Sequence, residues 1–286
     1  MLVWLNGRVL EARAARVSAL DRGLLHGDGL YDTWRTYGGR CFAADAHLRR
    51  LSAAAKRLEL PPPGDARVWA ARAERLAARN GLDDAAVRLT VTRGATGDAL
   101  LPQRRGRQTL LLTVRPLPGD LARRQAHGIA CVLLPFPRDA AFPWGTIKLI
   151  GHASAIVGRR HALRRGATEG LYVTGDGEVT EGTTSNFFAV ERGTLLTPPR
   201  ESGVLGGVTR DLVLRLARRL GIRAREERLS VARVRQAGEL FLTASTIEVL
   251  PVVRLDGRRV AGGTPGPVTR RLQRAYADHV RRAMRR

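Results

Sequence analysis

Lysine is almost absent from this chain. Of its 49 lysine and arginine residues, only Lys56 and Lys148 are lysines. Arginine replaces lysine well as a surface charge, but only lysine can present a neutral amine near neutral pH. Lys56 is expected on the polar face of a helix, whereas Lys148 lies in the apolar stretch PWGTIKLIGH. Retention of Lys148 against this bias suggests amine chemistry, with a Schiff base as first candidate, and an incidental charge is the equal alternative.

Cysteine is also scarce, and Cys41 and Cys131 offer neither a metal-ligand spacing nor a disulfide framework. No segment reaches the apolar length of a membrane span. Residues 1–20 lack the basic start, long apolar run and small-residue cleavage site of a signal peptide. These absences predict a cytoplasmic protein with no bound metal and no membrane association.

Aromatic residues make up only 5% of the chain, and its net charge is +23. The arginines occur mostly as scattered doublets, such as Arg49-Arg50 and Arg218-Arg219, without interleaved aromatics. This distribution favours solvated arginine-rich faces over a specific nucleic-acid site. Non-specific binding to polyanions at low salt is still expected.

The 286 residues, of which 44% are hydrophobic, suffice for two domains. We expect a small domain at 1–117, a linker at 118–124 and a large domain at 125–286. In the small domain, Asn6-Gly7 marks a hairpin turn, and Asp45 is expected to cap a helix that ends at Pro61–Gly64. A second helix is expected at 65–82, with strands at 85–94 and 108–117.

The large domain is expected to alternate strands and helices. A buried strand at 129–136 precedes a helix at 152–166, whose apolar side should carry Ala155, Ile156 and Leu163. Short strands follow, with turns at Gly175–Gly177 and Arg192-Gly193. Two further helices are predicted, one opening at GGVTR and the last at 267–284.

Several polar residues stand where one cofactor would need them. Glu181 ends a strand in GEVTEGTTSNFF, where the alternative is a turn cap. The glycines and Thr209 of GGVTR open a helix and so offer an anion site, or a plain loop. Ser245 and Thr246 follow another strand, and Arg50 lies on the first helix. An amine, a carboxylate and phosphate-binding groups together are what pyridoxal 5′-phosphate requires.

With these residues in this order, the chain resembles the class IV aminotransferases, the fold-type IV family of pyridoxal phosphate enzymes. The resemblance follows family order over nearly the whole chain. It implies an α+β fold with a smaller N-terminal α/β domain and a larger cofactor-binding domain built on a barrel-like mixed sheet. It also implies a homodimer. The matching segments are HGDGLYDTWRTYGG, HLRRL, VTRG, IKLIGHASAI, GATEGLYVTGDGEVTEGTTSNFF, GGVTR and TASTIEVLPV.

The same resemblance implies roles for individual residues. Lys148 would be the Schiff-base lysine, Glu181 the partner of the pyridine nitrogen, and Leu205 the residue against the ring face. Tyr31 would lie on the substrate side, with a core aromatic as its alternative. The phosphate would be held by Arg50, Val208 through its backbone N–H, Thr209, Ser245 and Thr246.

The resemblance leaves the substrate open. Where D-amino acid enzymes of the family carry an arginine and a histidine for the substrate carboxylate, this chain has Asp98 and Leu100. Arg35 is therefore a candidate for that role, as is the loop arginine group Arg104, Arg105 and Arg107, whose alternative is a solvated loop. His152 follows the lysine and is interpreted as a helix-start residue rather than a catalyst.

The predicted function is ping-pong transfer of an amino group from a D-amino acid or an (R)-amine to a 2-oxo acid. The first alternative is aminodeoxychorismate lyase, which gives 4-aminobenzoate and pyruvate, because YDTWRT also resembles the lyase members. The second is a branched-chain L-amino acid aminotransferase. A nucleic-acid-binding protein on an inactive scaffold is opposed by the intact lysine, glutamate and phosphate set.

Overall fold

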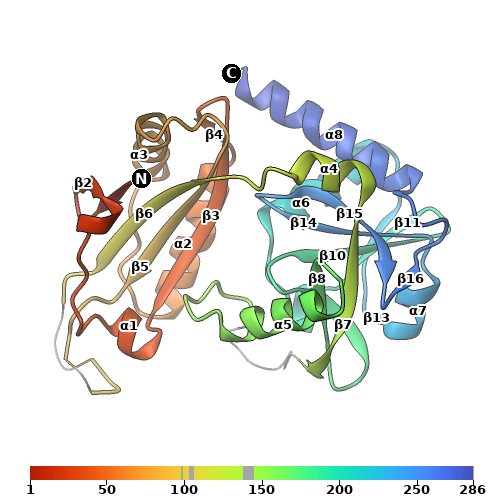
Figure 1. Cartoon of the computed structure of the whole chain (residues 1–286), viewed down its shortest axis with the longest axis horizontal. Helices are drawn as coiled ribbons and strands as arrows, with labels where there is room; N and C mark the ends of the chain where they lie inside the picture. Colours follow the sequence, from red (N-terminus) through yellow and green to blue (C-terminus); the bar gives the residue numbers. More distant parts are fainter. Residues whose placement is uncertain (98, 103–105, 138–144, 286) are drawn as a thin grey trace. The chain divides into compact units, whose positions relative to one another are not determined.

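The computed structural model describes residues 1–97, 99–102, 106–137 and 145–285. The chain divides into two compact units (Figure 1). Unit 1 comprises Met1–Leu117 with Ile147–Gly151, and unit 2 comprises Pro118–Thr146 with His152–Arg286. A five-residue segment far along the sequence therefore belongs to the N-terminal unit.

Unit 1 contains an antiparallel six-stranded sheet in the order β2-β1-β6-β5-β3-β4. The turn between β1 and β2 falls at Asn6 and Gly7, whose φ angles of 48° and 98° are both positive, as the predicted two-residue hairpin requires. The strands are β1 Leu2–Leu5, β2 Arg8–Glu11, β3 Gly29–Tyr37, β4 Arg40–Cys41, β5 Ala85–Thr92 and β6 Thr109–Pro116.

One face of this sheet is covered by two helices, α2 Ala44–Arg57 and α3 Ala66–Arg79. Helix α2 packs on β3, and α3 packs on β1, on β6 and against α2. Successive side chains of a strand point to opposite faces, so Tyr31 and Arg35 of β3 lie on the other face of the sheet. The remaining helical segments of unit 1 are the short η1 Ala12–Ala14 and α1 Arg22–His26.

The start of α2 differs from the prediction. Ala43, in a left-handed conformation at φ 53°, is the N-cap, and Asp45 lies one residue inside the helix. There Asp45 forms an ion pair with Arg49 one turn later, and its charge suits the positive end of the helix. The helix also ends at Arg57, before the proline run. By contrast, Asp65 caps α3 as an N-cap should, by accepting a hydrogen bond from the Arg67 amide at 2.7 Å.

Unit 2 is built on a closed barrel. Six strands pair in the cycle β9-β10-β14-β15-β7-β8, which the pairing of Asn186 on β10 with Glu181 on β9 closes. The sheet is mixed, because β7 runs parallel to β8 and to β15. The barrel strands are β7 Ile129–Pro137, β8 Glu169–Val173, β9 Glu178–Gly182, β10 Asn186–Glu191, β14 Glu239–Ala244 and β15 Glu248–Leu255.

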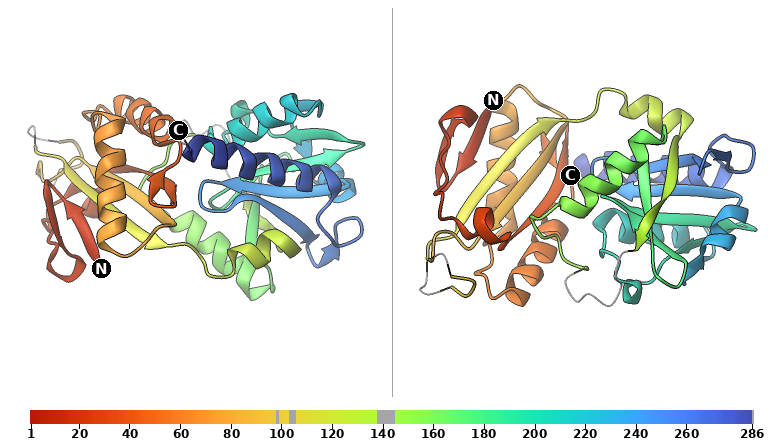
Figure 2. Two further views of the ribbon diagram at one scale, coloured as in Figure 1. Left: turned by 90° about the horizontal axis from the view of Figure 1, so that it is seen from above. Right: turned by 60° about the horizontal axis from the view of Figure 1, so that its bottom comes forward.

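Four short strands extend the barrel sheet, and helices cover it. Helices α6 and α8 contact each other and pack on β14, and α8 also packs on β15 (Figure 2). The short strands are β11 Thr194–Thr197, β12 Ala224–Glu226, β13 Leu229–Ser230 and β16 Arg258–Arg259. The helical segments are α4 Leu121–His127, α5 Ala153–Arg164, η2 Arg200–Ser202, α6 Val208–Arg219, α7 Val231–Gln236 and α8 Pro267–Met284.

The barrel core is a continuous apolar cluster that includes Cys131, Leu171, Phe187 and Leu240, all at most 1% exposed. A mixed α and β chain with a barrel-like sheet in its C-terminal part confirms the predicted fold class. The predicted linker 118–124 includes the first residues of α4, which begins at Leu121. The domain limits 1–117 and 125–286 stay predictions.

Of the three residues predicted on the apolar side of α5, Ala155 is half-buried, but the other two were predicted wrongly. Ile156 and Leu163 are 52% and 62% exposed, whereas Gly158 and Ala162 are buried. A Cβ atom at Gly158 would lie 2.8 Å from a methyl group of Thr183. The helix thus packs so close to the barrel that only small side chains fit beneath it.

None of the helices formed by the described residues is both long and apolar enough to cross a bilayer. Within the same residues, no three His, Cys, Asp or Glu side chains cluster in a way that would bind a metal ion.

Candidate active site

Lys148 belongs to unit 1 because its backbone is hydrogen-bonded to β3. The Tyr31 amide donates to the Lys148 carbonyl at 3.0 Å, and the Ile150 amide donates to the Gly29 carbonyl at 3.1 Å. A Cβ atom at Gly29 would lie 2.7 Å from the Val91 carbonyl oxygen, so the closeness of the chain here requires glycine. These contacts fix the backbone of Lys148 beside Tyr31.

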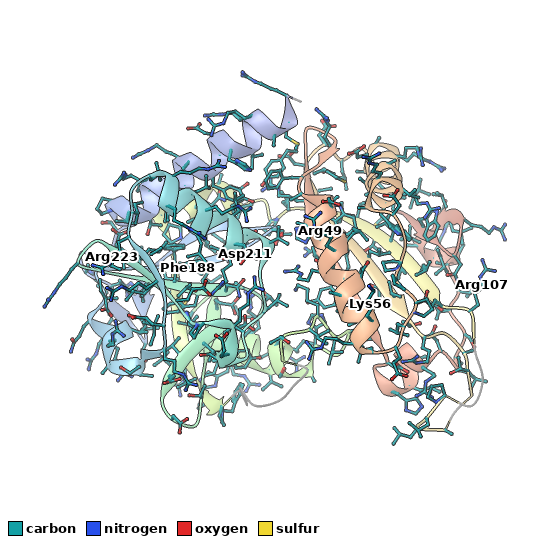
Figure 3. All side chains as sticks on the ribbon, turned by 180° about the vertical axis from the view of Figure 1, so that it is seen from behind. Arg49, Lys56, Arg107, Phe188, Asp211 and Arg223 are labelled. Atoms are coloured by element: carbon teal, nitrogen blue, oxygen red, sulfur yellow. The ribbon has the colours of Figure 1, made fainter. Side chains whose placement is uncertain are left out.

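The side chains of Lys148 and Tyr31 also meet. The Lys148 Nζ donates to the Tyr31 hydroxyl at 3.1 Å and lies 4.6 Å from the centroid of its ring. Tyr31 is only 7% exposed, and Lys148 is half-buried. Lys56, in contrast, is exposed on α2, as predicted (Figure 3). The structure therefore singles out Lys148 as the lysine in a protected polar contact.

Arg50 of α2 is held by a buried carboxylate. The Asp32 side chain accepts from Arg50 Nε at 2.9 Å and from Arg50 Nη2 at 2.7 Å, and His47 Nδ1 lies 2.9 Å from it. Burial would raise the pKa of Asp32, but the charges of Arg50 and His47 and their hydrogen bonds hold it well below its ordinary value. Asp32 thus stays ionised and fixes the plane of the Arg50 guanidinium.

Arg35 lies on the opposite face of β3, with its side chain 7% exposed. Its Nη2 is 3.4 Å from a carboxylate oxygen of Asp84, and its guanidinium carbon is 3.9 Å from the centroid of the Tyr37 ring. The positive charge of Arg35 is therefore already matched by a carboxylate within unit 1.

In unit 2, Glu181 is buried at the end of β9 and is 5% exposed. Its Oε2 accepts from the Asn186 side-chain amide and from the Leu205 backbone amide, both at 3.0 Å. Asn186 also donates to the Leu205 carbonyl at 2.8 Å. These bonds run to β10 and to the loop before α6, so Glu181 does more than cap its own turn, and its carboxylate is held in one orientation.

The N-terminus of α6 lies just after Leu205 in the chain. Gly207 is the N-cap and no side chain caps the helix there, so the amides of its first turn, including that of Val208, are oriented to bind an anion. A Cβ atom at Gly207 would lie 1.9 Å from the Asn186 Oδ1. Thr209 is buried in the first turn. The predicted anion site at GGVTR therefore adjoins the residues that hold Glu181.

Ser245 and Thr246 lie in the turn that joins β14 to β15 and are half-buried. The Ile247 amide closes this turn on the Ala244 carbonyl at 3.1 Å. Thr243, just before it, is the cross-strand partner of Asn186. The Thr243 hydroxyl is buried without a hydrogen-bond partner among the described residues. Polar groups thus gather around the Asn186 side of the barrel.

A model of the family described as amino-transferase class IV matches residues 29–255. The chain belongs to the class IV aminotransferases. It is therefore a pyridoxal 5′-phosphate-dependent enzyme. It is 33% identical over 278 residues to a putative branched-chain-amino-acid aminotransferase of Methanocaldococcus jannaschii, covering 97% of this chain and 96% of the relative.

Two further comparisons cover almost the whole aminotransferase. The D-alanine aminotransferase of Listeria innocua is 30% identical over 286 residues, which span 99% of this chain and 97% of the relative. The crystal structure of the Escherichia coli branched-chain amino acid aminotransferase superimposes with a TM-score of 0.91 at 28% identity, covering 97% of this chain and 93% of that one.

Each unit of this aminotransferase holds groups of the kind that its cofactor needs. Within unit 1 these are the Lys148 amine and the oriented Arg50 guanidinium. Within unit 2 they are the fixed Glu181 carboxylate, a helix start without a side-chain cap, and the buried hydroxyl of Thr243, which has no hydrogen-bond partner among the described residues. An aldehyde, a basic ring nitrogen and a phosphate need such groups.

Gly207→Ala is expected to weaken cofactor binding by about tenfold and to lower the free energy of unfolding by about 1–3 kcal/mol, because the added methyl group would displace Asn186 from Glu181. Cofactor release during dialysis, followed by absorbance, and urea unfolding measure the two effects. Gly175→Ala is the matched control, since a Cβ atom there meets nothing within 4 Å. Equal behaviour of the two variants would contradict the steric argument.

Six further residues were considered in the sequence, and the structure describes only some of them. Asp98, Arg104 and Arg105 lie outside the described residues. Leu100 is 79% exposed, Arg107 is exposed, and His152 is the N-cap residue of α5, as a helix-start residue should be.

Two functional candidates were missed in the sequence. Asp32 shares the helix-covered face of β3 with Leu30 and Trp34, so a charged residue in an apolar row was the available signal. Arg88 of β5 lies with its guanidinium carbon 3.8 Å from the centroid of the Tyr31 ring. The alternation in AAVRLTVT places Arg88 on the other face of the strand from the buried Val87 and Leu89. Nothing in the sequence indicates that Arg88 meets Tyr31.

Proposed function

We propose that this aminotransferase moves an amino group from a D-amino acid or an (R)-amine to a 2-oxo acid in a ping-pong reaction. The contact between the Lys148 amine and the Tyr31 hydroxyl carries the proposal, because it places the one protected lysine next to a proton-exchanging group. The end-to-end match to a D-alanine aminotransferase supports the choice of donor.

Lys148 Nζ would hold the cofactor. When free, the same amine would take the proton from the α-carbon of the amino donor in the first half-reaction and deliver a proton to the α-carbon of the amino product in the second. The bound cofactor supplies a ring that accepts electrons from that carbon. Tyr31, within hydrogen-bond distance of Nζ, orients the amine for both proton transfers.

The other assignments follow the same logic. Glu181 would face the ring nitrogen, with Asn186 and the Leu205 amide fixing its oxygen, and the side chain of Leu205 would lie against the ring. Arg35 stays a prediction for substrate binding. The phosphate would be bound by Arg50, the backbone amide of Val208, Thr209, Ser245 and Thr246.

A branched-chain L-amino acid aminotransferase is the second candidate. The relative from M. jannaschii and the E. coli structure favour it. The lyase alternative, which gives 4-aminobenzoate and pyruvate, stays a prediction that the same experiment tests.

Half-reactions with D-alanine, (R)-1-phenylethylamine, L-leucine and aminodeoxychorismate decide among these functions. We expect D-alanine or the (R)-amine to bleach the cofactor absorbance of the purified enzyme with single-exponential kinetics. Bleaching by L-leucine but not by D-alanine would instead establish the second candidate. Turnover of aminodeoxychorismate alone would establish the lyase.

The homodimer and the cytoplasmic location also stay proposals. Leu20, Leu24 and Leu25, at and before α1, are 55%, 71% and 45% exposed, which suits a surface covered by another subunit. Sedimentation at several protein concentrations tests for the homodimer.

A further inference from the structure

The face of the unit 1 sheet that α2 and α3 leave uncovered carries two arginines close to β3. Thr33 pairs with Arg88 and Tyr31 pairs with Thr90 in the antiparallel register. Arg88 is thus the diagonal neighbour of Tyr31 on one face of the sheet, which is within reach of a long side chain.

The Arg88 side chain runs toward the Lys148 end of this face. Its Nε donates to the Thr90 hydroxyl at 3.2 Å, and its guanidinium carbon lies 3.8 Å from the centroid of the Tyr31 ring. The hydroxyl of the same ring is 3.1 Å from Lys148 Nζ. One tyrosine therefore contacts both the reactive amine and a planar cation.

The surroundings of Arg88 favour an anion. Arg88 is half-buried, and burial lowers the pKa of its guanidinium, while the Tyr31 hydroxyl opposes this shift and Arg115 adds to it. A carboxylate bound here would add charge-assisted hydrogen bonds to the contacts that Arg88 makes with Thr90 and Tyr31. Arg35, on the same face, already has the carboxylate of Asp84 beside it.

We propose that Arg88 binds the carboxylate of the amino acid and of the 2-oxo acid, and that Tyr31 positions it next to Lys148. The inference rests on the proposed transaminase function and adds a preference for donors that bear a carboxylate. A guanidinium stacked on a ring keeps a fixed plane, so it can present two parallel N–H donors to a carboxylate. Arg88 is thereby the residue that distinguishes an amino acid from a simple amine.

Arg88→Gln tests this inference. KM for the preferred amino acid should rise about 10- to 100-fold, the effect of losing hydrogen bonds to a charged group, while kcat changes less. kcat/KM for (R)-1-phenylethylamine, which has no carboxylate, should stay unchanged. Arg88→Lys should recover part of the loss, and Arg75→Gln, at an exposed position on α3, should behave as the wild type.

Calorimetric titration with butyrate provides a readout that does not need turnover. Loss of Arg88 should weaken butyrate binding by about tenfold, with the cofactor absorbance unchanged. Equal losses for the amine and the amino acid, or butyrate affinity as in the wild type, would overturn the assignment. If the wild-type enzyme accepts no amino donor, the proposed function fails, and butyrate binding alone decides the role of Arg88.

Discussion

Lys148→Ala is expected to lower the rate of the amino-donor half-reaction by about 10³-fold, because the variant loses both the group that holds the cofactor and the base for proton transfer. Lys148→Arg should be equally inactive although it keeps the positive charge, since a guanidinium stays protonated. Stopped-flow absorbance measures the rates. This outcome would separate amine chemistry from a purely electrostatic role of position 148.

The chain itself provides the control for this experiment. Lys56 is the only other lysine and lies exposed on α2, so Lys56→Ala should retain wild-type rates. Borohydride reduction followed by peptide mass mapping should place the cofactor mass on Lys148 in the wild type and in Lys56→Ala. Finding that mass on another residue, or in the Lys148→Ala protein at normal yield, would refute the assignment of Lys148.

Asp32→Ala is expected to lower the free energy of unfolding by about 3–5 kcal/mol, because it leaves the Arg50 charge partly buried without its carboxylate. It should also weaken cofactor binding, since Arg50 loses the group that orients it. Urea unfolding measures the first effect and dialysis the second. Asp45→Ala, which removes an exposed pair with Arg49, should cost only about 0.5 kcal/mol.

The pH dependence of stability offers a second test of Asp32. Its pKa is lower in the folded protein than in the unfolded chain, so its contribution is present above the unfolded value of about 3.9 and disappears at lower pH. The lowered pKa of His47 adds a loss of stability below about pH 6.5, because the unfolded chain then binds the extra proton. Asp32→Ala should flatten the acidic part of this profile, and an unchanged profile would contradict the role of Asp32.

Local patterns predicted much of the fold. The Asn6-Gly7 hairpin, the second helix within 65–82 and the final helix at 267–284 depend on neighbouring residues, and all three were confirmed. The predicted start of α2 was wrong because Ala43, two residues before Asp45, is the N-cap and has a left-handed conformation that the sequence does not indicate. The buried side of α5 was wrong because close packing on the barrel selected Gly158 and Ala162 over the larger apolar residues.

In the candidate site, too, local patterns marked some residues but did not reveal contacts that depend on packing. Lys148 stood out through the composition, and Glu181, Thr209 and Ser245 stood out through their strand and helix ends. The contact of Asp32 with Arg50 depends on how α2 packs on β3. The contact of Arg88 with Tyr31 depends on the pairing and register of β3 with β5, which joins residues more than fifty positions apart. Neither contact follows from a local pattern.

The attachment of Ile147–Gly151 to β3 has a consequence for synthesis of the chain. The N-terminal unit gains the segment that carries its lysine only after residue 151 has left the ribosome, by which time Pro118–Thr146 of the barrel unit have emerged as well. A fragment that stops at Leu117 therefore lacks the segment whose backbone forms hydrogen bonds with the Gly29 carbonyl and the Tyr31 amide. Maturation of the smaller unit is in this way tied to the emergence of the larger one.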